Sequence, residues 1–241
     1  MPKTEGGARS TVALLWGEQG QPTRGPKPSL TPARIAEAAV AVADAEGLDA
    51  VSMAKVATSF GVSGMALYRY VPGKDELVDL MVEVVLAERP DLTDAGPDWR
   101  PRITAWARAI SAIYQAHPWL VKATTLRRHV TGPRQFGWMD TALAALELTG
   151  LSYAQQHQAF LLVIGHVRVT IQQSADFDAD YAREWGRLTA ERLDRDAERF
   201  PALTRAIAAG AFEPAGADAL EFGLDRILDG VQALIERAPH D

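Results

Sequence analysis

Residues 60 to 81, FGVSGMALYRYVPGKDELVDLM, hold two helix breaks only a few residues apart. Gly61 interrupts one apolar pattern of helical spacing, and the Pro72-Gly73 pair ends the next before a third begins at Lys74. Glycine tolerates the left-handed backbone of a turn, and proline lacks the N–H that a helix interior needs. The chain is therefore expected to fold here into short helices that are held close together.

The middle helix, GMALYRYV, is expected to begin at a Ser63 cap and carries Tyr68, Arg69 and Tyr70. A helix that only fills a core gains little from these side chains, whereas a helix that contacts another molecule can use all of them. Two short helices joined by FGVS have the pattern of a helix-turn-helix, whose second helix enters the major groove of DNA. The sequence therefore predicts a DNA-binding unit.

Helix signals also precede this motif. Thr31 is a suitable N-cap with Pro32 at the first helical position, and Gly47 follows the last apolar residue of that helix. Ser52 is placed to cap a second helix, MAKVATSF. The capped starts predict helices over residues 32 to 46 and from residue 53 onward.

The rest of the chain predicts longer helices. After the turn-rich stretch RPDLTDAGPD, amphipathic patterns recur to the end, and no segment alternates with period two for long. The expected fold is all-α, with a small N-terminal three-helix DNA-binding domain that contains the helix-turn-helix and a larger C-terminal helical domain. The expected divisions are a flexible arm over 1–30, a DNA-binding domain over 31–88 and a helical domain over 97–238.

Composition narrows the function further. The 241 residues include no cysteine, so disulfides and thiolate metal sites are excluded, and a cytoplasmic location is expected. The longest apolar run, AFLLVIG, is far shorter than the roughly 20 residues of a membrane span. A net charge of -6 argues against a protein that coats nucleic acid, although a local basic surface remains compatible with it.

The stretch AEGLDAVS, the motif FGVSGMALYRYV and the following GKDELVDLM together resemble the TetR family of bacterial repressors. The resemblance covers residues 31 to 85 closely, and EFGLDRILDGVQALI near the C-terminus more loosely. It implies a homodimeric repressor that binds a palindromic operator and is released by a small-molecule inducer, with no cofactor. It also implies that the larger helical domain is the ligand-binding and dimerisation domain. A regulator without an inducer, or an activator, stays open.

The resemblance also implies roles for single residues. Residues at the start of the second motif helix, together with its arginine, would contact the DNA bases: Ser63, Gly64, Met65 and Arg69. The two tyrosines, the lysine of the next helix and two residues of the first motif helix would contact the DNA backbone: Tyr68, Tyr70, Lys74, Ser52 and Lys55. A core position is the alternative for one of the tyrosines. Simple solvation is the alternative for Arg69 and Lys74.

One position departs from the family pattern. Many relatives carry an arginine where Ala54 stands, which removes an expected DNA contact. Arg24 and Lys27 in PTRGPKPS could replace it from the adjacent minor groove, as other N-terminal arms do. A plain terminus without a DNA role is the alternative for this arm.

The last helix has the spacing of a helix-pair seam. Its apolar residues follow a 4-3-4-3 pattern, which predicts a dimer interface formed with the QQHQAFLLVIGHVRVTI helix: Leu220, Leu224, Ile227, Val231 and Leu234. Gly223 and Gly230 would allow close approach of the helices. A seam inside one chain is the alternative.

A ligand pocket is expected among aromatic and polar residues of the larger domain. The candidates are Trp106, Trp119, Phe136, Trp138, His166, Thr170 and Gln173, with His117, His157 and Gln172 considered beside them. A core role is the alternative for each aromatic residue. His157 and His166 lie nearly opposite on one helix, and only His129 is near a tetracycline-type metal position, so neither a metal site nor tetracycline is implied.

An enzyme is the competing class. The sequence has no His-Glu-x-x-His, no phosphate-cradling glycine loop and no nucleophile elbow. The expectation is therefore a regulator and not an enzyme, with residues 74 to 88 as the pivot between its two halves.

Overall fold

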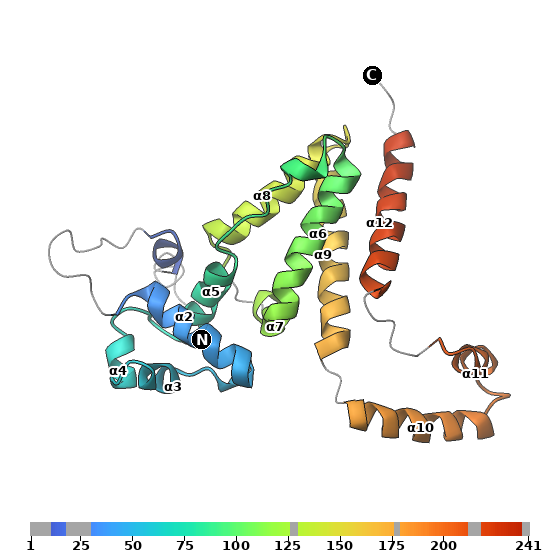
Figure 1. Cartoon of the computed structure of the whole chain (residues 1–241), viewed down its shortest axis with the longest axis horizontal. Coiled ribbons are helices and arrows are strands. Elements are labelled where there is room, and N and C mark those ends of the chain that lie inside the picture. The colour runs from blue at the N-terminus through green and yellow to red at the C-terminus, as the bar shows by residue number, and fades with distance from the viewer. Residues whose placement is uncertain (1–10, 18–29, 126–129, 176–178, 212–217, 238–241) are drawn as a thin grey trace.

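The computed structural model describes residues 11–17, 30–125, 130–175, 179–211 and 218–237, and these contain helices and turns only (Figure 1). Within these residues, no helix is long and apolar enough to cross a bilayer. The elements, in chain order, are α2 (Pro32–Glu46), η1 (Leu48–Ala50), α3 (Met53–Thr58), α4 (Gly64–Leu67), α5 (Lys74–Val85), η2 (Thr93–Ala95), α6 (Trp99–Ala116), α7 (Trp119–Thr125), α8 (Pro133–Glu147), α9 (Tyr153–Ala175), α10 (Ala179–Arg195), α11 (Pro201–Ala208) and α12 (Asp218–Arg237).

The first helices begin where their caps predict. The Thr31 side chain accepts a hydrogen bond from the Arg34 amide at 3.2 Å, and Ser52 does the same for Lys55 at 3.2 Å. Each bond satisfies one of the amide groups that a helix start leaves unpaired, which typically stabilises the helix by about 1 kcal/mol. Ser63 occupies the cap position of α4 but makes no side-chain capping bond.

The N-terminal half packs around α2 and α5, which contact each other, with α3 and α4 below α2 in Figure 1. Its core consists of fully buried apolar side chains: Ile35, Ala39, Val51, Val56, Leu67, Val71, Leu77 and Met81. The helix carrying the recognition residues is shorter than the sequence predicts, because α4 ends at Leu67 and residues 68 to 70 form a turn.

Residues 11 to 17 form a short helical turn that the prediction of a flexible arm over residues 1–30 does not include. Leu14 and Leu15 are buried, and the Thr11 hydroxyl donates to the Glu76 carboxylate of α5 at 3.3 Å. The Trp16 ring lies 6.5 Å from that of Phe136 on α8. This part of the N-terminal region is therefore packed against both halves of the molecule.

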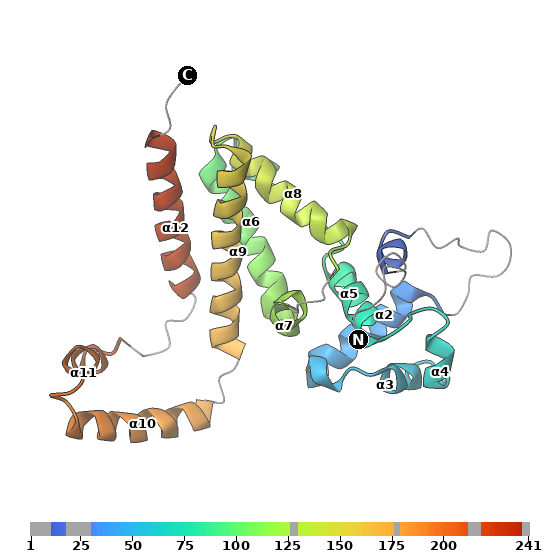
Figure 2. The same cartoon turned by 180° about the vertical axis from the view of Figure 1, so that it is seen from behind.

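The larger half is a bundle in which α6 contacts both α8 and α9, and α9 in turn contacts α12. The short helix α7 lies at the lower end of this bundle and contacts η1 and α5 of the N-terminal half. Figures 1 and 2 show α10 and α11 projecting away from the other helices, between the end of α9 and the start of α12. The bundle is thus connected to the N-terminal half mainly through contacts of α7 and α8 with α5 and η1.

Candidate nucleic-acid interface and ligand domain

The turn between α3 and α4 is built on Gly61, whose φ of 63° favours glycine. After it, the Val62 amide donates to the Ala57 carbonyl at 3.3 Å. Gly64 then lies against the start of α3, since a Cβ at this position would come within 3.3 Å of the Ala54 backbone. The structure therefore gives Gly64 a packing role that the expected base contact does not include.

One face of the α4 region is exposed. Met65 is 75% exposed and Tyr68 is 47% exposed, and Ser63 and Arg69 are also exposed. Tyr70 is half-buried against the core, so the core alternative describes its ring. The exposed side chains are of the types that read base edges and hold phosphates, and their contacts with DNA remain a prediction.

Two lysines flank this face. The Lys55 ammonium contacts the Glu46 carboxylate on α2, in a pair whose side chains are both partly exposed. Exposed pairs contribute little net free energy, so a DNA phosphate could replace Glu46 at small cost. Lys74, at the start of α5, is exposed and makes a long 3.4 Å bond to the Asp49 carbonyl. Arg24 and Lys27 of the N-terminal arm lie outside the described residues.

The two halves are joined by polar contacts that sequence reasoning missed. The Glu83 carboxylate on α5 accepts hydrogen bonds from the Arg134 and Gln135 amides at 2.8 and 3.0 Å, and so caps the start of α8. Gly132 allows this approach, since a Cβ there would fall 2.4 Å from the Glu83 Cδ. A movement of α8 would therefore be transmitted to α5, which carries Lys74.

A second junction lies at α7. One oxygen of Asp44, on α2, is 2.7 Å from both the Trp119 Nε1 and the His117 Nδ1. The Lys122 ammonium is 2.7 Å from both oxygens of Asp49, and its hydrogen bond and positive charge lower the Asp49 pKa. Trp119 and His117, expected near a ligand, therefore hold the DNA-binding half in place.

The tryptophans of the bundle are core residues. Trp106 and Trp138 are 1% and 4% exposed, with ring centroids 6.2 Å apart. The Trp106 Nε1 donates to the Trp138 carbonyl at 2.8 Å, and the Trp138 Nε1 donates to the Leu86 carbonyl at 3.3 Å. Both indole donors are already used, so the core alternative describes these two residues.

The other expected ligand residues are dispersed. Phe136 is 46% exposed on an open hollow of α8, His157 stacks against Phe160, and Gln172 and Gln173 are exposed near the end of α9. His166 packs under Gly223, where a Cβ would lie 2.2 Å from the ring, and Thr170 bonds back to the His166 carbonyl. The structure does not bring these residues together, and His129 lies outside the described residues.

The predicted dimer seam is divided between two surfaces. Leu224 and Val231 are 1% and 5% exposed within the single chain, where α12 packs against α9, so the internal-seam alternative holds for them. Leu220 and Ile227 are half-buried, and Leu234 is 39% exposed. The 4-3-4-3 spacing identified residues on one side of α12, but α9 of the same chain covers part of that side.

A different apolar surface is left open beside this seam. An open groove of about 510 Å³ lies between α9 and α12, lined by Leu162, Ile227, Gly230 and Leu234 among others. Exposed apolar side chains continue it along both helices: Leu161, Leu162 and Val169 on α9, and Phe222 on α12. Unpartnered apolar surface of this kind is typical of a protein–protein interface.

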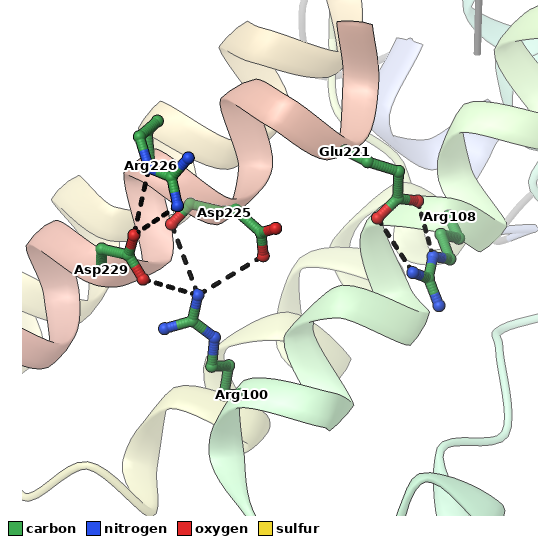
Figure 3. A network of polar contacts seen from close by, with 6 residues as sticks. All are labelled: Arg100, Arg108, Glu221, Asp225, Arg226 and Asp229. Atoms are coloured by element: carbon green, nitrogen blue, oxygen red, sulfur yellow. Dashed lines mark hydrogen bonds and ion pairs between the residues drawn. The ribbon is translucent and has the colours of Figure 1, made fainter. Parts of the chain in front are cut away.

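Ion pairs hold α12 against α6 (Figure 3). Arg108 makes a two-pronged contact with Glu221 at 2.7 and 2.9 Å, and Arg100 lies 2.7 Å from Asp229 and 3.4 Å from Asp225. The hydrogen bond from Arg108 lowers the Glu221 pKa, and its charge adds to this effect while burial opposes it. The network fixes the orientation in which α12 presents its free side.

Comparisons with known proteins match both halves of the chain. Residues 35–81 match the family "Bacterial regulatory proteins, tetR family", and residues 90–235 match "Tetracyclin repressor-like, C-terminal domain". The chain is 38% identical over 238 residues to the HTH-type transcriptional repressor DrrR1 of Streptomyces coeruleorubidus, covering 93% of this chain and 86% of that protein. It is 27% identical over 205 residues to the class A tetracycline repressor protein of Escherichia coli, covering 84% and 90% of the two chains.

Solved structures agree with these matches. The structure of apo ActR from Streptomyces coelicolor superposes with a TM-score of 0.75 at 25% identity, covering 89% of this chain and 100% of that chain. The structure of ActR in complex with actinorhodin gives a TM-score of 0.72 at 27% identity, covering 88% and 99%. The all-helical fold expected from the sequence is confirmed.

Proposed function

Because the chain belongs to the TetR family of bacterial regulatory proteins, we propose that it represses transcription by binding a palindromic operator as a homodimer, and that a small molecule releases it. The observation that carries the DNA-binding part is the exposure of Met65 on α4 and of Tyr68 and Arg69 in the turn after it, with Lys74 also exposed at the start of α5. The proposed division of labour assigns residues 31–88 to DNA and residues 97–238 to the ligand and the dimer. Such a repressor acts in the cytoplasm and needs no catalytic step.

The dimer is proposed to form through the open side of α9 and α12. The groove between them and the exposed Leu162 and Phe222 provide apolar surface that a second copy would cover. A twofold dimer uses the same patch on both chains and presents two copies of α4. The operator half-sites would then repeat the twofold symmetry of the protein, one or more helical turns apart.

Release by a ligand is proposed to follow the contacts between the halves. A ligand that prefers a conformer with misplaced α4 helices must weaken operator binding to the same extent, because binding linkage is reciprocal. A preference of about 1 to 3 kcal/mol gives a release of about 5- to 150-fold. The solved complex of ActR with actinorhodin supports a small-molecule ligand for this chain.

The test is a fluorescence anisotropy titration of the full chain on labelled DNA from its own upstream region, with scrambled competitor DNA present. Saturable binding that survives the competitor, at one dimer per palindrome, is the expected result. Binding that disappears with the competitor, or that falls away at modest salt, would reflect phosphate contact alone and would contradict the proposal for that DNA.

The alternative is a DNA-binding regulator that takes no small molecule. This alternative regulator would also bind an operator through α4, and it would differ from the proposed repressor only in having no ligand site in the larger domain. A chain that binds its operator but whose affinity no organic compound changes would favour this alternative.

A further inference from the structure

Arg168 is the only Lys, Arg, Asp or Glu on the 23-residue helix α9. It stands in the apolar run VIGHVRVTI, with Val167 fully buried on one side and Ile171 buried one turn on. Its own side chain is only partly exposed. Among the described residues Arg168 forms no ion pair, and its Nε donates a hydrogen bond to the Tyr114 hydroxyl at 3.4 Å.

A partly buried guanidinium without a carboxylate is an unusual choice for a core. Arginine has five N–H donors in a planar fork that matches a carboxylate, and burial makes unpaired charge costly. A long bond to one neutral hydroxyl satisfies little of this demand. Arg168 therefore has the donors and the charge to hold an anionic group that the chain itself does not supply within the described residues.

The hydroxyl groups next to Arg168 form a series of hydrogen bonds with a defined direction. The Thr124 hydroxyl donates to the Leu120 carbonyl at 2.7 Å, so its oxygen is left to accept. The Tyr114 hydroxyl, 3.0 Å away, then donates to Thr124, and the Tyr114 oxygen accepts from Arg168. This chain of bonds connects α9, α6 and the last turn of α7.

A further polar group lies on the same helix as Tyr114. Ser111 is 2% exposed, and its hydroxyl has no hydrogen-bond partner in the structure. It is three residues before Tyr114, and side chains at this spacing share a helix face. A buried hydroxyl without a partner, about one helical turn from the tyrosine that Arg168 contacts, is typical of a site whose ligand is missing.

We propose that Arg168, Tyr114 and Ser111 form the anion-binding end of the ligand site, and that the ligand is an organic acid with an apolar body. Arg168 pairs with the carboxylate, and the Tyr114 and Ser111 hydroxyls donate to its oxygens. The inference rests on the proposed ligand response and gives it a chemical class. It also gives a route, because a Tyr114 hydroxyl that turns to the acid leaves Thr124, and α7 carries the Trp119 and Lys122 contacts to Asp44 and Asp49.

The first experiment compares acids with their neutral amides on the full chain. The probes are benzoate, 2-naphthoate and anthraquinone-2-carboxylate, each beside its carboxamide, with binding measured by calorimetry. At least one acid should bind with a dissociation constant below about 1 mM and about tenfold or more tighter than its amide. The variant Arg168→Gln should remove this preference, Tyr114→Phe should reduce it, and the control Arg187→Gln on α10 should keep it.

Three results would overturn the proposal: no acid binds, acid and amide bind equally, or Arg168→Gln keeps the preference for the acid. Thermal unfolding without ligand separates the site from a structural tether. If Arg168 serves to bind the ligand, Arg168→Gln should melt at the same or a higher temperature than the wild-type chain. If Arg168 instead only stabilises the fold, the variant should lose as much melting temperature as Tyr114→Phe does. A loss of that size would also count against the proposal.

Operator binding of the same samples keeps the two proposals apart. If the wild-type chain binds operator DNA and Arg168→Gln binds it equally well without ligand, a failed acid preference rejects the anion site alone. If the wild-type chain binds no specific DNA, the proposed repressor function fails whatever the acids do.

Discussion

Glu83 on α5 accepts a hydrogen bond from the Arg134 amide at the start of α8, over 2.8 Å, and thereby connects the DNA-binding half to the helical half. Glu83 is 6% exposed, whereas Arg134 is an exposed residue, so the bond is partly shielded from water on the Glu83 side. A buried cap of this kind makes α5 and α8 move together. The pivot expected for residues 74 to 88 thus has a specific attachment point.

Removing this attachment should destabilise the fold. Glu83→Ala leaves the Arg134 and Gln135 amides unpaired, and the loss is expected to be about 1 to 3 kcal/mol of unfolding free energy. Urea unfolding measures it, with Glu236→Ala as the control, since Glu236 is exposed and accepts a hydrogen bond from Gln232 of its own helix. A loss below about 0.5 kcal/mol would mean that the cap does not couple the halves.

Substitutions on the proposed DNA face should separate base reading from phosphate contact. Arg69→Ala should lower affinity for the specific site by about 1 to 3 kcal/mol and leave non-specific binding nearly unchanged. Lys74→Ala should weaken binding to all DNA and reduce the salt slope by about 1. Anisotropy titrations at several salt concentrations distinguish these effects, with Arg187→Ala as a matched loss of charge on α10. Equal effects of Arg69→Ala on both kinds of DNA would rule out its role in base reading.

The buried contact between α9 and α12 and the open groove beside it should respond differently to substitution. Leu224→Ala removes a buried side chain and should cost about 2 to 5 kcal/mol of stability. Leu162→Glu, on the open groove, places a charge at a position that is 58% exposed in one chain. It should leave a folded monomer in analytical ultracentrifugation while the unmodified chain sediments as a dimer. A dimer that survives Leu162→Glu would place the interface elsewhere.

The Arg108–Glu221 pair should contribute a small dependence of stability on pH. The folded-state pKa of Glu221 lies below its ordinary value of 4.5, so the pair stabilises the fold above that pH, and this contribution is lost as the pH falls through the folded-state pKa. Glu221→Gln should cost no more than about 1 kcal/mol at neutral pH, because both side chains are partly exposed. Urea unfolding should show the difference from wild type shrinking toward about pH 3; a constant difference would indicate that charge is not its source.

Local signals explain why the N-terminal half could be predicted from sequence. The Thr31 and Ser52 caps and the positive φ of Gly61 each depend on a few neighbouring residues, so the sequence reveals them directly. The turn over residues 11 to 17 was missed because its stability comes from contacts with Glu76 and Phe136, which are distant in sequence.

The ligand and dimer residues depend on packing partners that spacing does not specify. Trp106 could have faced a pocket, and only the fold shows its Nε1 donating to the Trp138 carbonyl. Likewise, Leu224 shares a helix side with Leu234, but α9 of the same chain covers only the first of them. One usable signal was overlooked: Arg168 is a single charge in an apolar helix, and charge that interrupts an apolar run calls for a partner.

Selection of binding sites from a pool of random DNA by the purified full chain tests the central claim most directly. The account predicts enrichment of a palindrome whose half-sites lie one or more helical turns apart, and it predicts that Arg69→Ala loses this enrichment. Enrichment of no sequence, or of a site without twofold symmetry, would contradict a dimeric repressor that reads its operator through α4.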